Sequence, residues 1–308
     1  MKILSIALAI ALLACGKGKE ATPAPPPPDD GVRVLVAGSE PRQLLRYHVA
    51  KGTTNQIELA LDVDIDAAGQ GSALPTFVMT SEMVADEVMP DGSVTVRTTI
   101  SDVSARDRGG AAVTAEQLTE QTQVMRGLVL RGTLAPEGML RDTKVETASK
   151  VLPPGIAAQL DTLTKSFEQV AMPLPRTPVG VGASWMHTRT IAQSGMTMLT
   201  TTTVKLTAIA GDQLTFESAT VVSGTDQSVT QNGTTIKLSN ISGSGSGKGT
   251  VDLSRMMMSG ELVAEFGSDM SADGETTRMS MKMVTRLSPA KAAPAEPAPP
   301  RETLPTSP

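Results

Sequence analysis

Apolar and polar residues alternate along several long segments of this chain. Between Ile57 and Asp66, aliphatic residues occupy every second position and mostly acidic residues stand between them. A period of two puts successive side chains on opposite faces of a β-strand, so this segment is predicted to be a long strand with one buried face. The same alternation follows turn-forming residues at 94–100, 196–206, 214–220 and 279–287. The pattern predicts long antiparallel strands joined by tight turns.

Two segments carry a helical pattern instead. Residues 151–170 place apolar side chains three and four positions apart, and the segment stops before Pro173. Residues 114–125 begin with Thr114 and Gln117 at the spacing of a capping box, which predicts a short helix that covers the sheet. The predicted fold class is mainly β with one or two helices, a β-rich α+β protein. We expect its long antiparallel sheet to curve into a half-barrel or to consist of two copies of one unit.

Short motifs recur in the two halves of the chain. Residues 45–48 (LRYH) and 184–187 (SWMH) each open a run of predicted strands, and each run later contains a similar segment, 131–134 (RGTL) or 248–251 (KGTV). We interpret the recurrence as a duplicated β-unit, with the predicted helix at 151–170 as its bridge. The alternative is that β-proteins reuse similar hairpins because their composition is similar.

The N-terminal residues predict export. Lys2 precedes an apolar run at 3–14, which fits a secretory signal and is well short of the ~20 residues that span a bilayer as a helix. The sequence Leu12-Leu13-Ala14-Cys15 resembles the lipobox of bacterial lipoproteins. The resemblance implies cleavage between Ala14 and Cys15, a diacylglyceryl group on the Cys15 sulfur, and stable membrane anchoring by acyl chains. The alternative is an ordinary secretory signal with an incidental cysteine.

Composition separates a tether and a tail from the body. Residues 16–30 combine Lys, Pro and acidic residues, which predicts a solvated, extended tether, and the Pro- and Ala-rich C-terminal end is predicted to be disordered. The predicted organisation is a signal peptide at 1–14, lipidated Cys15 and tether at 15–30, a β-rich lobe at 31–150, a bridging helix region at 151–178, a second β-rich lobe at 179–288 and a tail at 289–308.

Charge and cysteine content narrow the class of protein. The formal net charge is −5 and the isoelectric point is near 5.2, with no basic stripe for phosphates, so nucleic acid is not an expected partner. Cys15 is the only cysteine, so an exported body of this kind has no disulfide and depends on its own core. If the sorting rule of Gram-negative lipoproteins applies, Gly16 favours the outer membrane, because aspartate at that position is the inner-membrane signal.

No motif indicates catalysis. The two histidines, His48 and His187, occupy equivalent places in the proposed repeat, but no Cys, Asp or Glu stands at a metal-ligand spacing beside them. Residues 243–250 (GSGSGKGT) superficially resemble a phosphate loop, yet Gly249 stands where that loop has Ser or Thr. We interpret this segment as a flexible connection between strands. The sequence therefore predicts no catalytic residue, no metal and no cofactor.

Methionine is the most unusual part of the composition. The chain has 17 methionines and only 2% aromatic residues, so methionine replaces rings as core filler. The alternative is that these methionines form thioether clusters that bind Cu(I), as in exported copper proteins. A curved sheet with few covering helices could also enclose a hydrophobic cavity, and a solidly filled sheet is the competing interpretation. The candidate ligand-contacting residues are Met196, Met198, Met279, Met281, Met283 and Phe167.

Two resemblances bear on function. In outline, the predicted sheet resembles half-barrel carriers that ferry lipoproteins or lipids across the periplasm. The lipobox, the tether and the motifs at 179–185 (VGVGASW) and 247–253 (GKGTVDL) are similar to uncharacterised lipoproteins of Gram-negative bacteria, which imply no activity. We expect a non-enzymatic, lipid-anchored protein of the cell envelope, at the outer membrane, that binds an envelope protein or a hydrophobic ligand or serves a structural role. A lipid carrier is one alternative, and an envelope enzyme that uses His48 or His187 is another.

Overall fold

The computed structural model describes residues 31–146, 164, 167–168, 171–193, 196–231, 234–272 and 274–290. Its strands form one 14-stranded sheet in which every strand pair is antiparallel. The strands are β1 (Arg33–Val36), β2 (Thr54–Ala67), β3 (Gln70–Ala73), β4 (Thr76–Val88), β5 (Val94–Arg106), β6 (Val129–Leu134), β7 (Leu140–Glu146), β8 (Ser184–Gln193), β9 (Met196–Ala210), β10 (Gln213–Ser223), β11 (Gln227–Gln231), β12 (Thr234–Asp252), β13 (Met257–Ala272) and β14 (Glu275–Pro289).

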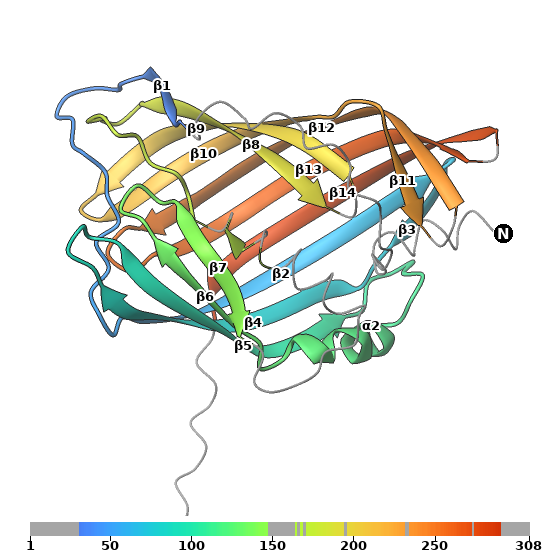
Figure 1. Cartoon of the computed structure of the whole chain (residues 1–308), viewed down its shortest axis with the longest axis horizontal. Helices are drawn as coiled ribbons and strands as arrows, with labels where there is room; N and C mark the ends of the chain where they lie inside the picture. Colours follow the sequence, from blue (N-terminus) through green and yellow to red (C-terminus); the bar gives the residue numbers. More distant parts are fainter. Residues whose placement is uncertain are drawn as a thin grey trace, which may run out of the picture.

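The sheet is open. Its order is β1-β8-β9-β10-β12-β13-β14-β2-β4-β5-β6-β7, with β11 beside β12 and β3 beside β2, so β1 and β7 are its edges. The pairing of β14 with β2 joins the predicted lobes at 31–150 and 179–288 into one sheet. In Figure 1 the sheet curls, and β8 and β7 lie in front of the central strands. The predicted mainly β class with long antiparallel strands is confirmed.

The two faces of the sheet follow from its register. Directly opposed residues of an antiparallel pair point to the same face, and successive residues point to opposite faces. Ile57 of β2 lies in the main hydrophobic core, so the odd-numbered residues of β2 define what we call the inner face. The acidic residues between them, including Asp62 and Asp64, lie on the outer face. The alternation predicted for residues 57–66 is thus confirmed.

The short predicted helix is also confirmed. Helix α2 (Ala115–Thr122) continues into the 3-10 turn η1 (Gln123–Met125), and the capping box of Thr114 and Gln117 is formed. The helix packs against β5, where the backbone N–H of Ala105 donates to Thr119 Oγ1 at 2.9 Å. The helix predicted at 151–170 lies mostly outside the described residues, as do the signal, Cys15, the tether and residues 291–308.

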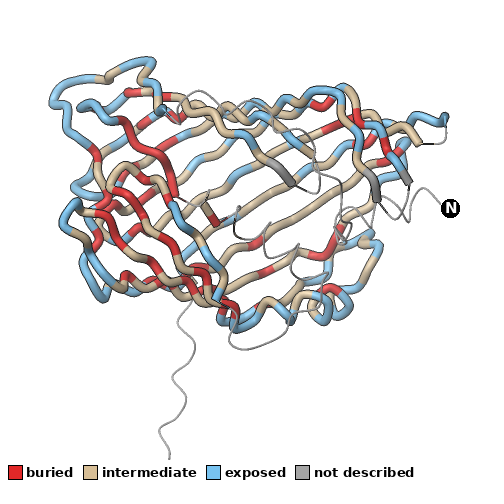
Figure 2. Tube along the Cα trace, viewed as in Figure 1, coloured by how far each residue is buried: buried red, intermediate tan, exposed pale blue. Residues whose placement is uncertain are grey.

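One end of the inner face is closed by two segments outside the named strands, residues 37–53 and 171–183, which together we call the plug. The phenol of Tyr47 donates to the Met172 carbonyl at 3.3 Å and links the two segments. The indole N–H of Trp185 on β8 donates to the Pro173 carbonyl at 2.9 Å. Leu45 and Leu174 from the plug are almost fully buried. Figure 2 shows buried residues concentrated at this end of the sheet.

Two predictions from the sequence are wrong at the level of single elements. Residues 45–48 do not open a strand as residues 184–187 do, because they lie in the plug. There the backbone N–H groups of Tyr47 and His48 donate to the carbonyls of Pro136 and Leu253, in two turns between strands. The Gly- and Ser-rich segment at 243–250 is no flexible connection, because it lies within β12 and pairs with both β10 and β13.

Candidate functional site

Beyond the plug, the inner face carries two rows of directly opposed residues that cross seven strands. A small buried cluster of Ile236, Leu238 and Ile241 lies beyond them, at the far end of the sheet. The first row is His187, Thr202, Thr220, Gly245, Ala264, Met283 and Val63. The second row is Arg189, Thr200, Val222, Gly243, Phe266, Met281 and Ile65.

The half of these rows on β13, β14 and β2 is apolar, and we call it the apolar wall. It consists of Ala264, Phe266, Met281, Met283, Val63 and Ile65, together with the adjacent Leu262 and Leu61, which Thr285 of β14 separates. These side chains face the same side as the core but are only partly buried, and Leu262 is 40% exposed. Leu206, on the same face at the plugged end, is 0% exposed. Part of the apolar inner face is therefore accessible to a ligand.

The glycines of β12 form a boundary across the rows. Gly243, Gly245, Gly247 and Gly249 all point to the inner face. A Cβ on Gly243 would lie 2.5 Å from the Glu265 carbonyl oxygen, and a Cβ on Gly245 would lie 3.0 Å from that of Val263. Because the backbone of β13 approaches so closely, a side chain at Gly243 would clash and one at Gly245 would require a small shift of β13. Glycine in a strand also permits a sharp bend. These glycines separate the apolar wall from strands β8 to β10.

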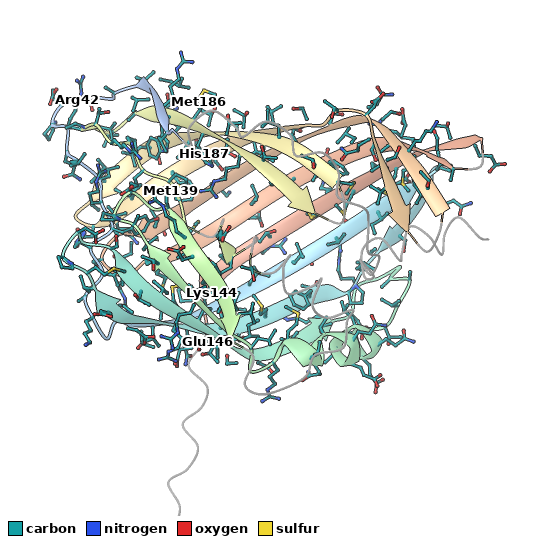
Figure 3. The ribbon with its side chains drawn as sticks, viewed as in Figure 1. Arg42, Met139, Lys144, Glu146, Met186 and His187 are labelled. Atoms are coloured by element: carbon teal, nitrogen blue, oxygen red, sulfur yellow. The ribbon has the colours of Figure 1, made fainter. Side chains whose placement is uncertain are left out.

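The other half of the rows, on β8, β9 and β10, is polar, and we call it the polar wall. It contains His187, Arg189 and three threonines, and in Figure 3 His187 lies on β8, in front of the central strands. Thr202 Oγ1 and Thr220 Oγ1 are 2.9 Å apart, and Thr200 Oγ1 donates to the Arg189 carbonyl at 3.2 Å. These hydroxyl groups thus bond to one another or to the backbone. Arg189 is the one formally charged side chain in the two rows.

His187 has a strongly perturbed pKa and lies on the inner face of β8. Its Nδ1 atom is buried and has no hydrogen-bond partner among the described residues. Burial and, second, the positive charge of Arg189 lower the pKa of His187 to about 4, so the imidazole is neutral at neutral pH. An unsatisfied buried polar atom is costly and often marks a place for a ligand or an ordered water.

His48 lies in a different environment, although the sequence placed the two histidines as equivalents. It is exposed on the plug, with Nε2 3.2 Å from Asp212 Oδ1 and Nδ1 3.0 Å from the Arg46 carbonyl. The Arg46 hydrogen bond is the largest cause of its raised pKa, and the Asp212 carboxylate adds to it. The structure therefore gives the two histidines no shared site, with His48 beside a turn and His187 on the inner face.

The candidate residues from the sequence lie in three places. Phe167 is buried in the main core, while Met196 and Met198 pack against the small cluster at the far end. Met279, Met281 and Met283 follow β14 on the inner face, and the last two belong to the apolar wall. The sequence analysis missed Phe266, Ala264 and Leu262, because Val263 stands between Leu262 and Ala264 and interrupts the alternation with polar residues along β13. It also missed that His187 and Arg189 lie on one face of β8.

The outer face has a groove of about 880 Å³ across β12, β13, β14 and β2. Three ion pairs lie in or beside it: Arg108 with Asp64 at 2.9 Å, Lys282 with Glu265 at 3.4 Å and Arg278 with Asp269 at 3.0 Å. Because charged and small polar side chains line most of this groove, it suits an apolar ligand less well than the inner face does.

The described residues contain neither a metal-binding cluster nor a membrane-spanning helix. No three His, Cys, Asp or Glu side chains in the described ranges group closely enough to hold a metal ion. No helix within those ranges is long and apolar enough to cross a membrane. Neither finding identifies an additional functional element in this part of the chain.

Part of the chain is similar to a protein family whose function is unknown. Residues 158–257 match the model of a family described as a family of unknown function (DUF6263). A search of the curated proteins finds no match. Among solved structures, a Bacteroides fragilis protein described as exported and as having a YmcC-like fold aligns at 10% identity. The alignment covers 78% of this chain and 98% of that chain, but its TM-score of 0.14 is too low to transfer fold or function.

Proposed function

We propose that the protein is a non-enzymatic, lipid-anchored protein of the cell envelope that binds the acyl chain of a lipid on the apolar wall. The observation that carries this proposal is the partial exposure of a mainly apolar surface on the face that forms the core elsewhere in the sheet. Contiguous exposed apolar surface in a folded protein commonly marks a binding site. The body would then hold its ligand close to the membrane to which Cys15 anchors it, which we propose to be the outer membrane.

The dimensions and composition of the wall suit an acyl chain. From Leu61 to Ile65 the apolar wall extends along β2 over four residue steps, or about 14 Å at the rise of a β-strand. One leaflet of hydrocarbon is about 15 Å thick, half of a bilayer core. Met281 and Met283 are flexible and adapt to an irregular aliphatic surface. Phe266 is the only aromatic residue of the wall, so a flexible aliphatic ligand fits better than a flat aromatic one.

Binding of radiolabelled palmitate and 1-hexadecanol to the purified full-length protein tests the proposal. Leu262→Lys places a charge on the apolar wall, and Val221→Lys is its matched control, because Val221 is 62% exposed on the outer face of β10. We expect Leu262→Lys to weaken binding of both ligands at least tenfold and Val221→Lys to leave it unchanged. Absence of binding to the wild-type protein, or equal effects of the two substitutions, would refute the proposed function.

A further inference from the structure

The polar wall lies on the same face of the sheet as the apolar wall and could contact the head group of a ligand bound there. His187 and Arg189 are two residues apart on β8 and therefore point to the same face. Each lies in a row that continues, strand by strand, to the apolar wall: His187 to Ala264 and Arg189 to Phe266. A single molecule lying across the strands would contact both walls.

The two side chains offer complementary interactions with an oxyanion. With its proton on Nδ1, a neutral imidazole donates a hydrogen bond, and the buried Nδ1 of His187 has no partner among the described residues. Arg189 supplies a positive charge close enough to lower the pKa of His187. Burial strengthens an electrostatic interaction with an anion, because the local dielectric is lower than that of water.

The distance between the walls also fits an amphiphile. From His187 on β8 to Ala264 on β13 there are four strand-to-strand steps, about 19 Å along the surface of the sheet. The glycines of β12 lie between them and present no side chains that would obstruct a chain crossing β12. An extended C16 chain is about as long as this path, so a tail that follows the sheet surface reaches β13 only with its end. The tail contacts more of the apolar wall if it crosses the inside of the curled sheet (Figure 1).

We infer that the polar wall binds the anionic head group of the ligand, so that the protein selects single-chain anionic amphiphiles, whose oxyanion contacts His187 Nδ1 and Arg189. This inference rests on the proposed function, since it assumes that the tail occupies the apolar wall. The alternative is that His187 is a buried histidine without a ligand.

Affinity measurements with three C16 ligands test the inference on the full-length protein. We expect palmitate or hexadecyl phosphate to bind at least tenfold more tightly than neutral 1-hexadecanol, and the ratio of the two anions distinguishes a carboxylate from a phosphate ligand. Arg189→Gln should remove this preference and leave hexadecanol binding unchanged, whereas Arg189→Lys should retain part of it. Lys205→Gln, which removes an exposed charge from the outer face of β9, is the matched control.

The outcomes separate the inference from the proposed function. If all three ligands bind equally, or if Arg189→Gln weakens all of them equally, the head-group assignment is wrong and the acyl site stands. If none binds, the proposed function fails and the inference fails with it.

NMR of the wild-type protein gives a test that does not depend on the folding of a variant. The chain has two histidines, so the imidazole signals of His187 and His48 can be followed separately. Addition of palmitate should shift the His187 signals strongly, and the signals of His48 on the plug should not move. Unchanged His187 signals in the presence of bound palmitate would contradict the inference.

Discussion

The plugged end and the open half of the sheet share strands but differ in what covers them. At the plugged end, inner side chains such as Trp185, Leu206 and Leu214 are 0% exposed. Farther along the same sheet, inner residues such as Met283 and Val63 are only half-buried. The strand pattern is the same in both regions, and the difference arises from the plug at 37–53 and 171–183. Alternation therefore identifies the inner face, but it does not show whether that face is filled.

The largest expected difference between the two regions is the cost of removing a leucine side chain. Leu206→Ala, in the plugged end, should lower the free energy of unfolding by about 2–5 kcal/mol, because it leaves a cavity in a packed core. Leu262→Ala, on the apolar wall, should lower it by less than about 1 kcal/mol, because Leu262 is already 40% exposed. Urea unfolding of both variants measures the difference. Equal costs would mean that the open half is packed like the plugged end.

The second effect is a dependence of stability on pH that originates in the open half. The folded-state pKa of His187 is about 4, below its ordinary value of 6.5, so the unfolded chain binds more protons between these values. Stability is therefore lost as pH falls from 6.5 toward 4, by up to about 3 kcal/mol at 1.36 kcal/mol per pKa unit.

His187→Gln removes this titration, so its unfolding free energy should fall less between pH 7 and pH 4 than that of the wild-type protein. Urea unfolding at both pH values measures the change, and His48→Gln is the control for loss of a histidine outside the inner face. If His187→Gln and the wild-type protein lose stability in parallel, His187 is not buried in the way the structure shows.

A smaller effect concerns the link within the plug. Tyr47→Phe removes the hydrogen bond to the Met172 carbonyl and should cost about 1 kcal/mol, because the ring still fills its place in the core. Hydrogen exchange should become faster in residues 171–183 and stay unchanged in β13 and β14. Uniformly faster exchange throughout the sheet would show that the plug and the open half unfold together.

The smallest effect is expected at the exposed histidine. Asp212→Asn should lower the pKa of His48, because the Asp212 carboxylate stabilises the imidazolium, but the Arg46 carbonyl should keep part of the elevation. The dependence of stability on pH has the opposite sign to that of His187. The interaction of His48 with Asp212 stabilises the fold at low pH, and this contribution disappears as pH rises through the raised pKa of His48. NMR titration of the His48 ring measures the shift. An unchanged pKa would exclude an interaction with Asp212 in solution.

Local patterns were sufficient for the strands that alternate apolar and polar residues and for the capped helix. The alternation at 57–66 and the capping box at Thr114 each report on a structure formed within a few residues. The segment around Leu45, Tyr47 and Val49 alternates in the same way but lies in the plug, because its hydrogen-bond partners are turns far away in sequence. Glycine and serine in β12 looked like a connection because composition does not show that the backbone of β13 approaches there.

The candidate site was only partly predictable for the same reason. Met281 and Met283 were found because they alternate within one strand. Their relation to His187 and Arg189 depends on a register that runs through β8, β9, β10, β12, β13 and β14, and no local pattern contains it. Sequence reasoning therefore identified the apolar wall in part but could not identify its polar counterpart.

Native mass spectrometry tests the central claim, that the open half of the inner face holds an acyl ligand, most directly. The full-length protein would be extracted from its own membranes, and its native mass would be compared with its mass after denaturation, which retains covalent lipid. Ala264→Trp fills the apolar wall, and Ala219→Trp, on the exposed outer face of β10, is its control. The account predicts a lipid-sized excess that denaturation removes in the wild type and Ala219→Trp, and no such excess in Ala264→Trp. No excess in the wild type, or the same excess in Ala264→Trp, would contradict it.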